Sequence, residues 1–193
     1  SEDSDASVHS MLDAAIERGM EAVCITDHLD KDFPKTPDFP AGAFLFDLGN
    51  YFQRLTQLKE EYQKKLEVRI GVEIGLQPHL GEYYRNLTEK YPFDFVIGSV
   101  HLIHGQDPYY RTFFEGRSDE EAYQEAFQVT IENLKKVNSF DSLGHLDYVV
   151  RYGTHQAEEY SYKKYAEEID EILKILIAQG KGLEMNMAGM KYG

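Results

Sequence analysis

Short apolar runs rich in β-branched residues alternate along this chain with longer segments of helical periodicity, and this alternation restricts the fold more than any other feature. The short runs cover residues 23–26, 68–73, 95–100, 142–150 and 182–186. Near-continuous apolar strands separated by helices are typical of a parallel sheet covered by helices. The pattern predicts an α/β fold with about five strand-helix units. Because a closed barrel usually has more strands, we expect the sheet to be open at one or both ends.

The helical segments are marked by apolar residues at intervals of three and four. They cover residues 8–16, 48–62, 122–137 and 162–176, with a shorter helix over 80–91. Ser7 is the predicted N-cap of the first helix, and Gly19 is its predicted stop. Neither an internal repeat nor an interdomain linker interrupts the pattern, so we expect a single domain over residues 1–193.

Charge and composition exclude several classes of function. The formal net charge is −14, whereas nucleic-acid-binding surfaces need clustered lysine and arginine. No apolar stretch reaches the roughly 18 residues that a membrane helix requires. Cys24 is the only cysteine, and its apolar neighbours favour a buried small side chain over a nucleophile. A lone cysteine permits no internal disulfide, so we expect a reducing compartment and a cytoplasmic location.

Four side chains that can bind metals follow four successive predicted strands. His28 follows the first strand, Glu73 ends the second, His101 ends the third and His145 lies beside the fourth. The carboxyl ends of parallel strands meet at one edge of a sheet, which is where α/β barrels build their active sites. A lone histidine at a strand end is more often structural, but four such residues in register predict a metal centre.

The donor types indicate the metals and the chemistry. Imidazole and carboxylate ligands without thiolate suit Zn, Fe or Mn ions. Glu73 could bridge two cations through its two oxygens. Such a cluster clamps a phosphate and lowers the pKa of a bound water, which makes hydroxide available for in-line attack at phosphorus.

The order of the motifs resembles that of a known family. The segments AAIERGMEAVCITDH, GVEIG, IGSVH and GHLDYVVRY follow one another as they do in the PHP (polymerase and histidinol phosphatase) superfamily, and they are most similar to the histidinol-phosphate phosphatases. The resemblance covers essentially the whole chain and implies a distorted (β/α)7 barrel that holds two or three metal ions. It implies that Glu73 bridges metals, that His101 and His145 bind one of them, and that His28 binds a third.

The resemblance also shows where this sequence departs from the family pattern. Ser1 to Ser4 fit the tail of the family's first motif, so Asp3 is a further candidate ligand, with a solvated terminal acid as the alternative. The preceding HxH motif and the final DxH motif are absent from the sequence. We therefore expect a PHP-type domain truncated at both ends, with weak or no activity in this form, and self-association through exposed sheet edges.

Other residues near the motifs are secondary candidates. In the family pattern Arg151 would grip the substrate phosphate, a task that suits a guanidinium fork, and the alternative is a surface ion pair. Arg111 and Arg117 are weaker candidates. Asp27 and Asp147 each neighbour a predicted histidine ligand, and each could orient that ring or cap a helix.

Taken with the resemblance, these features predict a metal-dependent phosphomonoester hydrolase. The leading hypothesis is a histidinol-phosphate phosphatase of histidine biosynthesis that acts on a small phosphorylated substrate. One alternative is another PHP phosphoesterase, acting on nucleotides or phosphotyrosine. The other is an interaction module that keeps the PHP shell without catalysis, although the intact internal motifs disfavour it.

Overall fold

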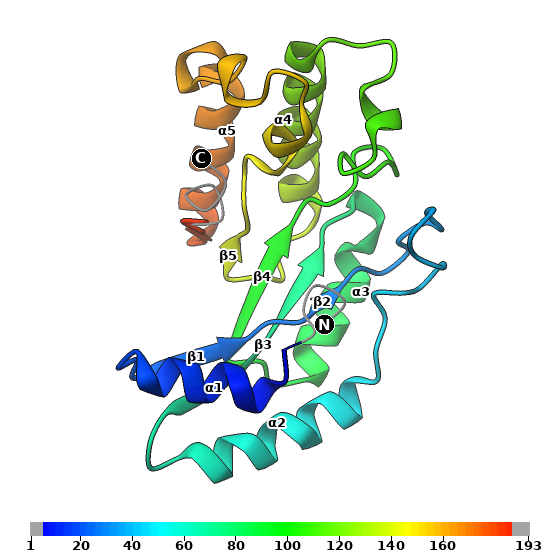
Figure 1. Cartoon of the computed structure of the whole chain (residues 1–193). Helices are drawn as coiled ribbons and strands as arrows, with labels where there is room; N and C mark the ends of the chain where they lie inside the picture. The colour runs from blue at the N-terminus through cyan, green and yellow to red at the C-terminus, as the bar shows by residue number, and fades with distance from the viewer. Residues whose placement is uncertain (1–5, 187–193) are drawn as a thin grey trace.

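A parallel sheet with helices against it forms the framework of the computed structural model, which describes residues 6–186 (Figure 1). Within this range the strands pair in the order β1-β3-β4-β5-β6, and β2 also pairs with β3. Every one of these pairings is parallel. The strands are β1 (Ala22–Ile25), β2 (His28–Leu29), β3 (Glu67–Gly75), β4 (Phe95–Ser99), β5 (Ser142–Leu143) and β6 (Gly182–Leu183).

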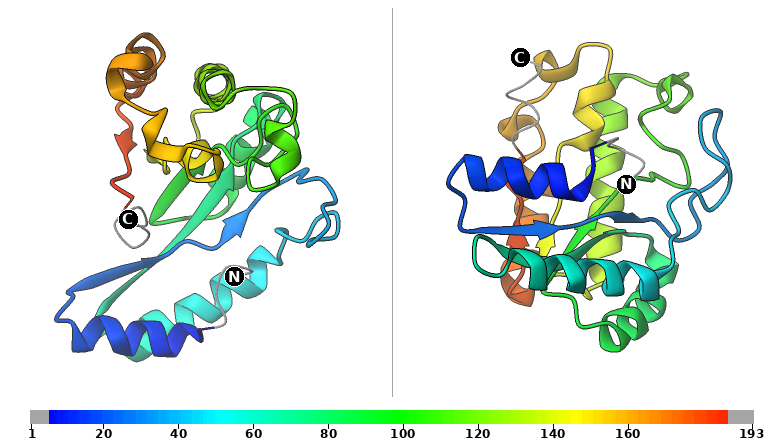
Figure 2. Two further views of the ribbon diagram at one scale, coloured as in Figure 1. Left: turned by 45° about the horizontal axis from the view of Figure 1, so that its top comes forward. Right: turned by 60° about the horizontal axis from the view of Figure 1, so that its bottom comes forward.

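The described residues also form five α-helices. They are α1 (Val8–Glu17), α2 (Leu48–Tyr62), α3 (Gly81–Lys90), α4 (Asp119–Lys136) and α5 (Ala166–Gln179). Ser7 caps α1 by accepting a hydrogen bond from the Ser10 amide at 3.1 Å, as predicted. Helices α1 and α2 lie together beside β1, whereas α4 and α5 lie at the opposite end of the sheet (Figures 1 and 2).

The structure corrects several details of the sequence prediction. One is the run at 182–186, which is a strand only over β6. The run at 142–150 is a strand only over β5, and it continues as a 3-10 helix at Tyr148–Tyr152. Val149 and Val150 are buried in that 3-10 helix, and a short apolar run does not distinguish a strand from a buried helical turn. The fourth predicted helix begins at Ala166 instead of residue 162, because Tyr162–Lys164 forms a separate 3-10 turn. The short strand β2 was not predicted.

The register of the sheet brings the predicted metal ligands to one edge. His28 in β2 lies directly opposite Glu73 in β3. His101 lies just after the end of β4, and His145 lies just after the end of β5. Because all these strands are parallel, their carboxyl ends gather the four side chains on the same side of the fold.

Within residues 6–186 the buried hydrophobic side chains form two clusters that meet at β3. The smaller cluster joins α1 and α2 to β1 and includes Val68 and Ile70 of β3. The larger cluster includes Val72 and Ile74 of β3 and extends over α3, α4 and α5. The alternation of apolar residues along a single long strand therefore supports packing at both ends of the sheet.

Candidate metal centre

Three histidine rings present their Nε2 atoms to the carboxylate of Glu73. The Nε2 atoms of His101 and His145 lie 3.2 and 3.3 Å from Oε1 of Glu73. The Nε2 atom of His28 lies 3.6 Å from the other oxygen, Oε2. The Glu73 side chain is only 12% exposed. The four residues predicted from the sequence are thus brought together around one carboxylate.

The spacing of these donor atoms fits a divalent ion. Two ligands held at about 2.0–2.1 Å by one tetrahedral ion are separated by roughly 3.3 Å. The Nε2 atoms of His101 and His145 are 3.3 Å apart, and each is at nearly the same distance from Oε1 of Glu73. Oε1 is buried and accepts no hydrogen bond from the described residues. This triad of donors therefore has the composition and the spacing of a metal site.

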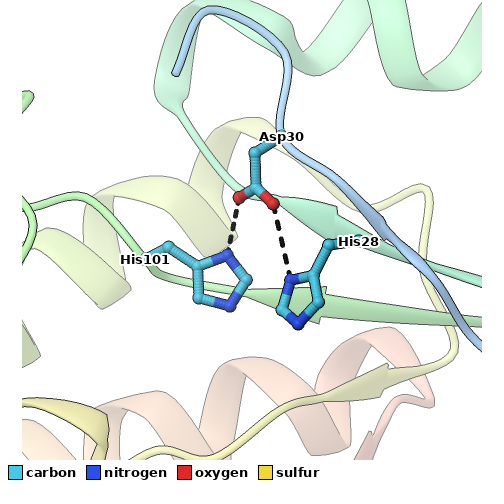
Figure 3. Close-up of side chains that lie close together, drawn as sticks. All are labelled: His28, Asp30 and His101. Atoms are coloured by element: carbon cyan, nitrogen blue, oxygen red, sulfur yellow. Dashed lines mark hydrogen bonds and ion pairs between the residues drawn. The ribbon is translucent and has the colours of Figure 1, made fainter. Parts of the chain in front are cut away.

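Asp30 lies behind two of these histidines, as Figure 3 shows. Its Oδ1 is 2.6 Å from Nδ1 of His101, and its Oδ2 is 3.5 Å from Nδ1 of His28. The Asp30 residue is 3% exposed. Burial alone would raise the pKa of its carboxyl group, but the two histidines lower that pKa to about 2. Asp30 therefore stays ionised throughout the neutral range.

The buried charges also shift the pKa values of His101 and Glu73. Burial alone would lower the pKa of His101, but Asp30 and Glu73 raise it well above its ordinary value of 6.5. Burial alone would raise the pKa of Glu73, but the neighbouring histidines lower it well below its usual range. Without a metal, the site thus favours an imidazolium ring between two carboxylates.

These residues open onto a cavity of about 580 Å³. Arg151 lines it from the 3-10 helix, with its guanidinium carbon 5.8 Å from the centre of the Tyr148 ring. Asp107 also lines it, and the Asp107 carboxylate accepts a hydrogen bond from the Tyr148 hydroxyl at 3.0 Å. The rest of the wall is largely aromatic, with Phe33, Phe39, Phe44, Tyr109 and Tyr152.

The secondary arginine candidates lie elsewhere. Arg111 donates hydrogen bonds to Tyr152 O and Thr154 Oγ1, and Arg117 pairs with Glu125. Neither arginine lines the cavity. Asp3 falls outside the described residues.

Sequence reasoning missed two acidic residues that support the site. Asp30 could have been found, because residues i and i+2 of an extended segment share a face and Asp30 follows His28 at that spacing. Glu184 gives no such signal. It follows β6, and its Oε2 accepts a hydrogen bond from the His145 amide at 2.8 Å, a contact that depends on the pairing of β5 with β6.

The structure bears on two further expectations, the burial of Cys24 and the lack of a membrane-spanning helix. Cys24 is half-buried, and burial is the main cause that raises the pKa of its thiol to about 11, which disfavours a thiolate nucleophile. None of the helices within residues 6–186 combines the length and the apolar character needed to cross a bilayer.

Comparison with protein families decides the relationship suggested by the motifs. The PHP domain model matches residues 1–188. This chain belongs to the PHP family. The histidinol-phosphatase of Lactococcus lactis is 33% identical to this PHP chain over 187 residues, which are 96% of the chain and 67% of the relative. The probable histidinol-phosphatase of Clostridium acetobutylicum is 31% identical over 186 residues, 96% of the chain and 69% of that relative.

Solved structures agree with this placement in the PHP family. One such structure is the crystal structure of histidinol phosphate phosphatase from Lactococcus lactis in complex with zinc, L-histidinol and phosphate. It matches this PHP chain with a TM-score of 0.87 and 32% sequence identity. The match covers 96% of this chain and 68% of the Lactococcus lactis protein. A putative histidinol phosphatase from Listeria monocytogenes has the same fold, with a TM-score of 0.73 at 19% identity over 95% of the chain and 77% of that protein. The predicted α/β fold of the PHP type is confirmed.

Proposed function

We propose that this PHP protein is a histidinol-phosphate phosphatase, a metal-dependent hydrolase that releases phosphate from a small phosphomonoester. The observation that carries this proposal is the match to the Lactococcus lactis enzyme solved with zinc, L-histidinol and phosphate, which extends over 96% of the chain at 32% identity. The site of the present chain supports it, because imidazole and carboxylate donors surround a cavity that also contains an arginine.

The proposed roles follow the contacts in the site. Glu73 would bridge ions through its two oxygens, His101 and His145 would hold one ion on the Oε1 side, and His28 would hold another on the Oε2 side, with Asp3 as a further ligand. A divalent metal supplies Lewis-acid chemistry that lowers the pKa of water and neutralises phosphate charge. The protein itself contributes the fixed, largely buried donor atoms and the walls that limit access of bulk water.

Arg151 is the proposed phosphate-binding residue. A charge-assisted hydrogen bond of this kind contributes about 1.5–3 kcal/mol, so we expect Arg151→Met to lower kcat/KM about 10- to 100-fold. Arg151→Lys keeps the positive charge but loses the two parallel donors of the guanidinium group. The kcat/KM of this variant should lie between those of the wild type and Arg151→Met. Steady-state phosphate release measures the effect. The control is Arg69→Met, which removes an exposed arginine of β3. Equal losses of kcat/KM in Arg151→Met and Arg69→Met would contradict the proposed role of Arg151.

A substrate panel tests the proposed function. Because weak or no activity is expected without the HxH and DxH motifs, the assay uses the protein with both motifs present and supplied with Zn²⁺ or Mn²⁺. Phosphate release is measured from histidinol phosphate, a nucleoside monophosphate and phosphotyrosine. We expect the highest kcat/KM with histidinol phosphate. Preferential hydrolysis of another phosphomonoester would support a metal-dependent phosphatase but overturn the assignment of histidinol phosphate as the substrate. Release from none of the three would contradict a phosphatase.

The remaining parts of the proposal concern metals, location and assembly. Zn is the leading metal, and Fe or Mn would suit the same donors, in a cluster of two or three ions. The single Cys24 favours a reducing compartment such as the cytoplasm. Among the described strands, β1 and β6 pair on one side only, so we propose self-association through these edges. A monomer at every concentration in light scattering would contradict that proposal.

A further inference from the structure

Asp30 contacts two histidines from different strands with the same carboxylate. Oδ1 faces Nδ1 of His101 and Oδ2 faces Nδ1 of His28 (Figure 3). An ionised carboxylate can only accept hydrogen bonds, so the His101 ring carries a proton on the Nδ1 atom that lies 2.6 Å from Asp30. The ion-pair contact at 3.5 Å favours the same position for the proton on the His28 ring. In a neutral ring the lone pair is then on Nε2. These are the two Nε2 atoms that point toward Glu73.

The 2.6 Å contact indicates that Oδ1 of Asp30 accepts a hydrogen bond from His101, although the donor atoms of His28, Asp30 and His101 also lie close enough together to hold a metal ion. Two ligands of one tetrahedral ion are roughly 3.3 Å apart, whereas Oδ1 of Asp30 is 2.6 Å from Nδ1 of His101. That separation is short for two ligands of one ion and typical of a charge-assisted hydrogen bond. The donor atoms on the Glu73 side have the wider spacing that an ion requires.

The surrounding structure holds the Asp30 carboxylate in this place. A Cβ atom at position 75 would lie 2.0 Å from Oδ1 of Asp30, so the end of β3 accommodates the carboxylate only with glycine there. The buried Tyr84 hydroxyl accepts a hydrogen bond from the Lys31 amide at 3.3 Å and lies 3.2 Å from Leu29 O. The backbone is therefore fixed on both sides of Asp30.

We propose that Asp30 is a positioning residue that sets the orientation and the tautomer of His28 and His101 together, so that both Nε2 atoms are available to divalent metal. This inference rests on the metal-dependent function proposed above. His145 provides an internal comparison. Its Nδ1 has no hydrogen-bond partner among the described residues, and its backbone amide is held by Glu184 instead. The Asp30 carboxylate therefore acts on two of the three rings.

Asp30→Asn tests this role without changing the size of the side chain. An amide offers one acceptor oxygen and one donor nitrogen, so it satisfies only one Nδ1–H group and drives the other ring to the Nε2–H tautomer. We expect the affinity of the 193-residue chain for Zn²⁺ to fall about 10- to 100-fold, measured by competition with a chromophoric chelator. Nitrogen-15 spectra of the zinc-loaded chain should show Nδ1–H on His28 and His101 in the wild type, an altered ring in the variant, and an unchanged His145.

Two further variants separate positioning from general damage. Gly75→Ala displaces the Asp30 carboxylate without altering it and should weaken Zn²⁺ binding in the same way. Asp141→Asn removes a carboxylate that accepts from the Val96 amide at 2.8 Å, at the opposite end of the strands, and should leave Zn²⁺ affinity unchanged.

Two results would overturn the proposal. One is wild-type Zn²⁺ affinity with unchanged ring tautomers in Asp30→Asn. The other is loss of one whole Zn²⁺ equivalent while the remaining ion binds with wild-type affinity, because that would make Asp30 a direct ligand. Neither measurement uses a substrate, so a failure of this inference is distinct from a failure of the histidinol phosphate assay.

Discussion

Replacement of Glu73 by Gln is expected to reduce phosphate release about 1000-fold and to remove bound metal. The substitution keeps the shape of the side chain but removes the charge shared by three histidines. Metal ions contribute several kcal/mol of transition-state stabilisation, and about 4 kcal/mol corresponds to a factor of about 1000 in rate. The measurements are the steady-state rate of phosphate release and the metal content of the purified variant.

The matched control for this prediction lies on the same strand. Glu67 begins β3, is exposed and forms an ion pair with Arg69 at 2.9 Å. Glu67→Gln removes one carboxylate from β3 without touching the site, so it should keep both its metal and its activity. A Glu73→Gln protein that retains more than a tenth of the wild-type rate with full metal content would contradict the bridging role.

The apparent affinity for Zn²⁺ is expected to keep rising with pH above 7. Asp30 and Glu73 raise the pKa of His101 above 6.5, and a protonated ring must release its proton before it can bind a metal. Below that raised pKa the affinity therefore falls as the pH falls, by about tenfold per pH unit for one displaced proton. We therefore expect a lower affinity at pH 6 than at pH 8. The carboxylates of Asp30 and Glu73 are already ionised in this window, since their pKa values are lowered.

Competition with a chelator of known protonation constants, repeated at each pH, measures this dependence. His9→Gln is the control, because His9 is exposed on α1 and contacts Glu61 away from the site. Its profile should match that of the wild type. An affinity that levels off at or below pH 6.5 would show that the proton on His101 is held no more tightly than in a free histidine.

Much of the candidate metal centre was predictable because its proposed ligands follow from strand positions alone. His28, Glu73 and His101 lie at the ends of clear apolar runs, and parallel strands bring such ends together whatever the details of packing. His145 was predictable for the same reason, even though β5 is shorter than the run that marked it. The periodicity of the helices was equally informative, since α1 to α4 begin and end close to the expected positions.

The parts that escaped prediction depend on tertiary contacts. Asp30 lies outside every strand and helix expected from the sequence, and its importance comes from its contact with His101, which is distant in sequence. Glu184 supports His145 only because β6 pairs with β5. The 3-10 helix at Tyr148–Tyr152 and the strand that was expected there would both bury valines, so hydrophobicity did not separate them.

The division of the core into two clusters implies that the two sides of the metal centre differ in how readily they open. Clusters of unequal size unfold locally at different free energies, and the smaller one costs less to open. His28 lies between Ile25 of the smaller cluster and Leu29 of the larger one, whereas His101 and His145 follow β4 and β5, whose buried Val96 and Leu143 belong to the larger cluster. Local unfolding of α1, β1 and α2 therefore exposes the Oε2 side of Glu73 to solvent before the Oε1 side. An ion on that side should exchange with solution faster than its neighbour, which would make the centre kinetically asymmetric although one carboxylate joins its halves.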